Sequence, residues 1–213
     1  MQLHEQFRPK RWDDVVGQDK AIEQINQLRK RDLGGRAYFI SGQSGTGKTT
    51  IAKLLAAEVA DEICTVEIDA SIATPARLTI IEQELNLYGW GGGKGRAYII
   101  NEAHGLSRPS IRQLLVLLER LPNHVIFVFT TTNEGVEDLF EEKIDAHPLL
   151  SRCQEIKLSR RNLSEPFAQR ARDIAIAAGL NGKPANEYRK LLTKHKNNLR
   201  TALQEIESGA MLI

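Results

Sequence analysis

Short apolar segments alternate with amphipathic segments along most of the chain, and this alternation predicts strands that are each followed by a helix. The strand candidates are residues 36–40, 64–69, 96–104, 124–130 and 154–158. The helix candidates between them are residues 20–29, 50–59, 75–87 and 107–119. The segment 124–130 is almost continuously apolar, as expected for a central strand of a parallel sheet covered on both faces. The predicted fold class is therefore α/β, with a parallel sheet flanked by helices.

The two ends of the chain differ from this alternation. Residues 1–18 carry few helix signals, and Pro9 favours an extended entry. From about Ser159 onward the pattern predicts helices only, at residues 165–178, 185–192 and 198–207. We therefore expect an α/β domain at residues 1–159, followed by a small all-α domain of three helices at residues 160–213.

One segment between a predicted strand and a predicted helix carries the clearest chemistry. Residues 42–49, GQSGTGKT, fit the spacing G-x-x-x-x-G-K-[ST] of the phosphate-binding loop, or P-loop, of nucleoside triphosphatases. Glycines let consecutive backbone N–H groups point at phosphate oxygens, Lys48 can reach the β- and γ-phosphates, and Thr49 offers a hydroxyl to Mg²⁺. The candidate nucleotide contacts are Gly42, Ser44, Gly45, Thr46, Gly47, Lys48, Thr49 and Thr50. The α/β domain is thus predicted to be a P-loop NTPase fold.

Composition, charge and cysteine content exclude fewer functions than the P-loop motif does. The 213 residues are 41% hydrophobic and 26% charged, with a formal net charge of +2, which neither indicates nor excludes nucleic acid as a partner. Cys64 and Cys153 stand far apart, so neither a disulfide framework nor a structural zinc site is expected. The polar N-terminus and the lack of a long apolar run favour a cytoplasmic protein, or a nuclear one in a eukaryote, with no membrane partner.

Ahead of the P-loop, residues 8–18, RPKRWDDVVGQ, resemble the adenine-side motif of AAA+ ATPases of the clamp-loader group. That group includes the small subunits of replication factor C and the bacterial clamp-loader motor. The resemblance implies ATP as the nucleotide and places Val15 and Val16 around its adenine. Bacterial motors carry a four-cysteine zinc insertion near residues 89–95, which this chain lacks, so a relationship to the replication factor C branch is expected.

The end of the third predicted strand, residues 99–102, resembles the Walker B motif of apolar residues followed by Asp-Glu. The resemblance implies that Glu102 polarises the attacking water and that position 101 holds Mg²⁺ through water. Asn101 departs from the motif, because its amide oxygen can accept a hydrogen bond from a metal-bound water but carries no charge. A natural adjustment, an inactive paralogue and an engineered variant that traps ATP are all open interpretations.

Three later positions complete the resemblance. Asn133 matches sensor 1, which positions water against the γ-phosphate, and Arg200, within residues 197–203, matches sensor 2. Arg152, in the sequence Ser-Arg-Cys, matches the arginine finger that reaches a neighbouring subunit's γ-phosphate. A finger of this type contributes on the order of 10³ to 10⁵ in rate.

Taken together, the resemblance implies an ATPase that couples Mg-ATP to loading a sliding clamp on primed double-stranded DNA, in an assembly with homologous AAA+ subunits. The third helical domain, which forms the collar of such subunits, is absent from these 213 residues, so either the sequence is truncated or the protein assembles differently. Two alternatives remain open. Asn101 favours a module that binds ATP with little hydrolysis, and the missing collar favours another AAA+ remodeller of DNA.

Overall fold

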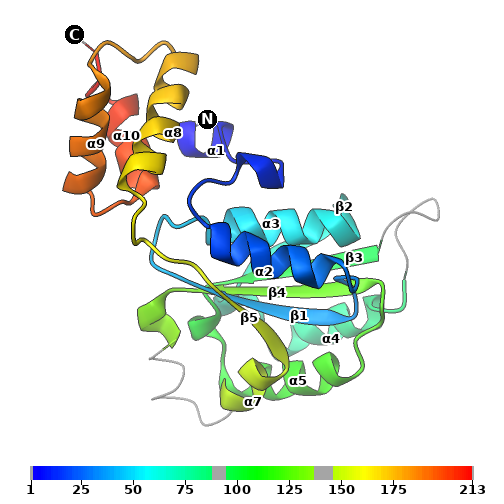
Figure 1. Cartoon of the computed structure of the whole chain (residues 1–213). Coiled ribbons are helices and arrows are strands. Elements are labelled where there is room, and N and C mark those ends of the chain that lie inside the picture. The colour runs from blue at the N-terminus through cyan, green and yellow to red at the C-terminus, as the bar shows by residue number, and fades with distance from the viewer. Residues whose placement is uncertain (1, 88–94, 137–145, 213) are drawn as a thin grey trace.

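The computed structural model describes residues 2–87, 95–136 and 146–212. A five-stranded sheet in the order β2-β3-β4-β1-β5 forms the centre of this part of the chain (Figure 1), and every strand pair in it is parallel. The strands are β1 (Arg36–Ser41), β2 (Ala60–Asp69), β3 (Gly95–Asn101), β4 (Val125–Thr131) and β5 (Cys153–Lys157). The predicted α/β fold with a parallel sheet is confirmed.

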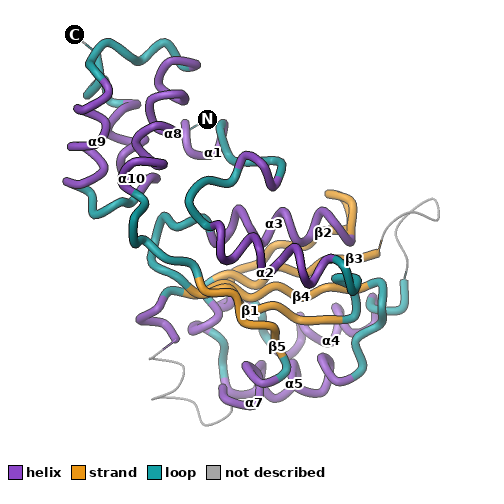
Figure 2. The backbone as a smooth tube through the Cα atoms, viewed as in Figure 1, coloured by secondary structure: helices purple, strands orange, loops and turns teal. Residues whose placement is uncertain are grey.

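Helices cover both faces of the sheet (Figure 2). One face carries α2 (Asp19–Arg29) and α3 (Lys48–Val59), and the other carries α4 (Pro75–Glu84), α5 (Arg108–Glu119) and α7 (Ala146–Ser151). Short 3₁₀ turns lie at Trp12–Asp14, Ala70–Ile72 and Ala103–Gly105.

Strand β4 shows why its sequence is almost continuously apolar. Ile126 and Val128 belong to the hydrophobic cluster under α2 and α3, whereas Phe127 and Phe129 belong to the cluster under α4 and α5. All residues of β4 are buried, because both of its faces contribute to a core.

A separate group of helices, called the lid here, follows the sheet. It consists of α8 (Ser164–Ala177), α9 (Ala185–Lys194) and α10 (Leu199–Glu207), and these helices enclose their own hydrophobic cluster. Gly179, with φ of +68°, follows the end of α8, where a left-handed residue commonly terminates a helix. The domain boundary between residues 159 and 160 stays a prediction.

The N-terminal arm, residues 2–18, differs from the extended segment expected from its sequence. It forms a one-turn helix, α1 (Leu3–Gln6), which lies against the lid (Figure 1). Leu3 is buried in the lid cluster, and Phe7 and Val16 pack against that cluster. A single turn is too short to show helical periodicity, and isolated turns are unstable in water, so packing on the lid stabilises this one.

The strand ends also depart from the predicted limits. The third strand stops at Asn101 rather than continuing to residue 104, because Glu102 has a left-handed backbone with φ of +52°. Helix α4 ends at Glu84, three residues before the predicted limit at residue 87. No helix in the described ranges is both long and apolar enough to cross a membrane.

Candidate nucleotide-binding site

The P-loop, residues 42–49, joins the end of β1 to the start of α3, as its sequence predicts. Gly45 and Gly47 have φ of +78° and +99°, and Gly47 is the N-cap residue of α3. L-residues with a side chain rarely adopt these angles, so glycine is required for the tight turn. The turn brings the free N–H groups and the positive dipole end of α3 to the loop, where phosphate groups are favoured.

Lys48 is the cation of this loop. Its side chain is buried, and Nζ donates to the carbonyl oxygens of Gly42 at 2.9 Å and Gln43 at 3.2 Å. Burial lowers the pKa of Lys48, Arg200 and Arg160 lower it further, and Glu102 opposes them. The ammonium group therefore lies in a poorly solvated position beside other cations, which a bound anion would stabilise.

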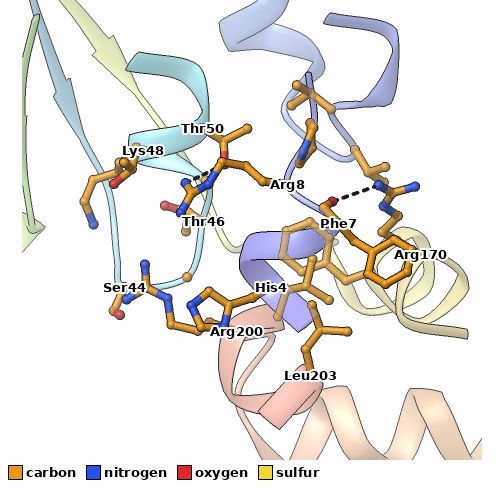
Figure 3. A pocket seen from close by; sticks show the side chains of 18 of the residues that line it. His4, Phe7, Arg8, Ser44, Thr46, Lys48, Thr50, Arg170, Arg200 and Leu203 are labelled. Carbon is orange, nitrogen blue, oxygen red and sulfur yellow. Dashed lines mark hydrogen bonds between the residues drawn. The ribbon is translucent and has the colours of Figure 1, made fainter. Parts of the chain in front are cut away.

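A cavity opens over the P-loop and is lined by the arm, the P-loop, the residues that follow β3 and β4, and the lid (Figure 3). Its apolar lining comes from the arm and the lid: Phe7, Val15, Val16, Phe167, Ile174, Leu199 and Leu203. Its arginine and lysine side chains come from the arm, the P-loop and the lid: Arg8, Lys48, Arg170 and Arg200. An apolar wall suits a nucleobase, and clustered cations suit a polyphosphate, so the residues present fit a nucleotide.

The N-terminal arm bridges the P-loop and the lid at this cavity. Arg8 Nη1 donates to Thr50 Oγ1 at 3.4 Å, and its other terminal nitrogen pairs with Glu5. Arg170 of α8 donates to the carbonyl oxygen of Phe7 at 3.2 Å (Figure 3). Neither Arg8 nor Arg170 is among the site residues predicted from the sequence. The Arg-Pro start of the adenine-side segment was a signal for Arg8, but Arg170 had none.

Glu102 lies at the end of β3 and lines the cavity. Its Oε2 lies 3.6 Å from Nδ1 of His104, which is also 3.0 Å from the Thr131 hydroxyl. A left-handed non-glycine residue costs on the order of 1 kcal/mol or more, and such residues concentrate at functional sites. Strand and turn thus hold this carboxylate near the P-loop lysine.

Asn101 is tied to the neighbouring strands. Its Nδ2 donates to Glu67 Oε1 of β2 at 2.8 Å, and its Oδ1 accepts from the Thr130 hydroxyl of β4 at 2.8 Å. Glu67 also forms an ion pair with Lys53 of α3 at 2.9 Å. The side chain of Asn101 does not line the cavity. The amide therefore links three strands, a role in which its N–H₂ group is needed.

The oxygen groups around the P-loop fit Mg²⁺. This ion takes oxygen ligands, keeps several waters, and needs only one or two protein groups when phosphates supply the rest. Thr49 and Glu102 line the cavity, whereas the Asn101 oxygen accepts a hydrogen bond from Thr130 and lies outside the lining.

The remaining predicted positions lie elsewhere. Asn133 is exposed and outside the cavity lining, whereas the preceding residue, Thr132, lines the cavity. Arg152 pairs with Glu119, donates to the carbonyl oxygen of Pro148 at 3.0 Å, and does not line this chain's own cavity. The run of three threonines at 130–132 gives no sequence signal for which residue faces the site.

Comparisons with known proteins agree with this geometry. Residues 38–160 match the ATPase family associated with various cellular activities (AAA). DNA polymerase III subunit gamma of Buchnera aphidicola subsp. Baizongia pistaciae is 30% identical over 191 residues, covering 78% of this chain and 49% of the relative. DNA polymerase III subunit tau of Escherichia coli (strain K12) is 31% identical over 178 residues, covering 73% of this chain and 26% of the relative. The chain thus spans about half or less of these curated relatives.

A solved structure of a Thermotoga maritima RuvB variant superposes with a TM-score of 0.72 at 18% identity, covering 94% of this chain and 64% of that one. At this identity the likeness concerns the fold alone. The gamma and tau subunits are bacterial, whereas the missing four-cysteine insertion predicted a relationship to the replication factor C branch. A metal-binding insertion at a loop can be absent without changing the core, so two cysteines do not separate this chain from the bacterial branch.

Proposed function

Because this chain belongs to the AAA family of ATPases, we propose that it binds Mg-ATP in the cavity between the P-loop and the lid and hydrolyses it within an assembly. The observation that carries this proposal is the convergence of Lys48, Glu102 and Arg200 from three elements on one cavity with an apolar wall. Val15 and Val16 pack against the base, and residues 44–50 hold the phosphates. Bound Mg²⁺ would neutralise charge on the phosphate oxygens.

Each polar residue has a role in the proposed reaction. Glu102 orients the attacking water, and its carboxylate lies 3.6 Å from Nδ1 of His104. Arg200 and Lys48 stabilise the charge that spreads over the transferred phosphoryl group. Either Asn133 or Thr132 positions the water, and the cavity lining favours Thr132. Asn101 would hold Mg²⁺ through a water, provided that its oxygen accepts a second hydrogen bond besides the one from Thr130.

Arg152 acts on a neighbouring subunit in this proposal. It lies outside the cavity of its own chain, as a residue that serves the next subunit would. Its partners, Glu119 and the Pro148 carbonyl, are released when it inserts into the neighbour's site. The isolated chain should therefore bind ATP but turn it over slowly.

The relatives named above are subunits of DNA polymerase III, and this supports a narrower proposal. We propose that the chain works with homologous AAA+ subunits in the cytoplasm as a clamp-loader motor on a sliding clamp and primed DNA. Hydrolysis by the assembled protein is measured with and without clamp and primed DNA. Stimulation by both supports clamp loading, whereas stimulation by DNA alone, unchanged by the clamp, indicates a different remodeller of DNA.

A second candidate function is an ATP-binding module with little hydrolysis. The observation that favours it is the amide at position 101, which hydrogen-bonds to Glu67 and Thr130 and carries no charge for the metal. Tight ATP binding by the assembled protein, with turnover that does not fall in Arg152→Ala, would support the module over the motor.

A further inference from the structure

Arg160 belongs to the segment that connects β5 to α8, and this segment runs between the sheet and the lid (Figure 1). No role is predicted for Arg160 from the sequence. Its Nη2 donates to the carbonyl oxygen of Ser44 in the P-loop. Residues 44 and 160 are thus in direct contact although they belong to different parts of the chain. The contact places a guanidinium group against the phosphate-binding loop, next to Ser44, which lines the cavity, although Arg160 is not itself part of the lining.

The backbone around Arg160 is held on two sides. Gln18 donates to the carbonyl oxygen of Ser159 at 2.9 Å and accepts from its N–H at 3.2 Å. Asn197, which precedes α10, donates to the carbonyl oxygen of Arg160 at 3.2 Å and accepts from the Ser164 hydroxyl at 2.8 Å. Arg160 is therefore positioned by the core and by the lid, unlike a freely rotating surface arginine.

Charge around Arg160 is poorly balanced. Burial lowers the pKa of Arg160, and Glu134 is the carboxylate that opposes this effect. The charges of Arg200 and Arg160 both lower the pKa of Lys48, so three cations lie near one another at the P-loop. Within the described part of the chain, Arg160 Nε is buried and has no hydrogen-bond partner. Like charges held together in this way are stabilised when an anion enters between them.

A guanidinium group has five N–H donors, and the Ser44 carbonyl occupies only one side of the group. We propose that Arg160 is a further phosphate-binding residue, which contacts the terminal phosphate of the nucleotide and links that phosphate to the segment between the two domains. This inference rests on the nucleotide site proposed above. It assigns to the connecting segment a contact that ATP makes and ADP lacks.

The test compares Arg160→Gln with Arg161→Gln in the full chain. Glutamine at 160 keeps an amide donor near the position of the arginine Nε but carries no charge. Arg161 is an exposed neighbour whose loss changes the net charge equally. Calorimetric affinities for ATP and ADP are measured with each protein in the same buffer. A hydrogen bond to a charged group contributes about 1.5–3 kcal/mol, so Arg160→Gln should weaken ATP binding by about tenfold or more. ADP binding should change by less than about threefold, and Arg161→Gln should change neither.

Equal losses for ATP and ADP, or a loss matched by Arg161→Gln, would overturn the inference. Arg160→Lys keeps the charge and should retain more ATP affinity than Arg160→Gln, and it serves as the readout should glutamine disturb folding. Failure of the wild-type chain to bind either nucleotide would instead reject the proposed function. Wild-type binding with an unchanged ratio of ATP to ADP affinity in Arg160→Gln rejects only the role of Arg160.

Discussion

At the residue scale, the amide at position 101 illustrates how one atom's chemistry is set by its neighbours. A carboxylate there would lose the donor that Glu67 accepts from and would place two negative groups in contact. We predict that Asn101→Asp lowers the free energy of unfolding by about 1 kcal/mol, because the exposed carboxylate of Glu67 loses its amide donor and two like charges repel. Urea denaturation of the nucleotide-free protein measures the change.

The matched control for that substitution is the exchange Asn101→Asp with Glu67→Gln, which rebuilds an amide–carboxylate pair with the groups reversed. It should recover most of the lost stability. An Asn101→Asp protein as stable as the wild type would show that the Glu67 contact contributes nothing, and would weaken the assignment of Asn101 as a link between strands.

Arg152 leads to a different expectation. Its ion pair with the exposed carboxylate of Glu119 contributes about 1 kcal/mol or less to folding. Arg152→Ala should therefore melt within a few degrees of the wild type, while ATP turnover in the assembled protein falls by about 10³-fold or more if the residue is a finger. Normal turnover by an assembled Arg152→Ala protein would remove the assignment.

Residues of the P-loop could be predicted from the sequence because their spacing has one structural meaning. Lys48 and Gly47 lie where the motif places them. Asn133 and Thr132 could not be separated, because a one-residue change in where β4 ends decides which side chain meets the cavity. Arg160 and Arg170 were not predicted, since nothing in the local sequence shows that an exposed-looking arginine returns to a distant loop.

At the element scale, Gln18 connects three segments. This buried side chain precedes α2 and bonds to the Thr46 carbonyl and to both backbone groups of Ser159. We predict that Gln18→Ala lowers the free energy of unfolding by about 2–3 kcal/mol, because buried backbone groups lose their partners. Thermal unfolding gives the comparison with Gln24→Ala, which removes one exposed hydrogen bond from the same helix and should cost less than about 1 kcal/mol. Equal effects of the two substitutions would contradict this view of Gln18.

The pairing of α9 with α10 gives a prediction about pH. Hydrogen bonds from Lys194 and then His195 lower the pKa of Glu205 below its ordinary value of 4.5. A lowered carboxyl pKa stabilises the fold above the unfolded pKa, and the contribution is lost as the pH falls through the lower folded value. Glu205→Gln should therefore be less stable than the wild type by about 1 kcal/mol or less at pH 7, with the difference shrinking below about pH 4. A difference that stays constant between pH 7 and pH 3 would argue against the ion pair.

Most of the elements could be predicted because hydrophobic periodicity reports burial directly. Strand β4 and helix α5 are each long enough to show their period. Helix α1 could not be predicted, since its four residues hold one buried side chain and gain their structure from the lid. Strand β3 ends at Asn101 because Glu102 has a left-handed backbone, and hydrophobic periodicity does not predict backbone angles of this kind.

At the scale of the whole molecule, the proposal requires a neighbour that completes each site. Molecular mass in solution should rise when ATP and Mg²⁺ are added to the chain or to the chain with its homologous subunits, because binding free energy favours the state that binds the nucleotide better. Light scattering measures the mass, with ADP as the control nucleotide. A mass that is the same with ATP, with ADP and without nucleotide would contradict assembly through the nucleotide site.

The packing of Leu3 and Phe7 against the lid also bears on how the protein is made. Both residues are translated before the sheet, whereas their partners on α8 and α10 emerge only after the entire sheet has been translated. Contacts so distant along the chain form late, because closing a long loop is entropically costly. The sheet can therefore fold on the ribosome before α1 has its packing partners. The apolar wall of the ATP cavity, which the arm and the lid form together, is completed last.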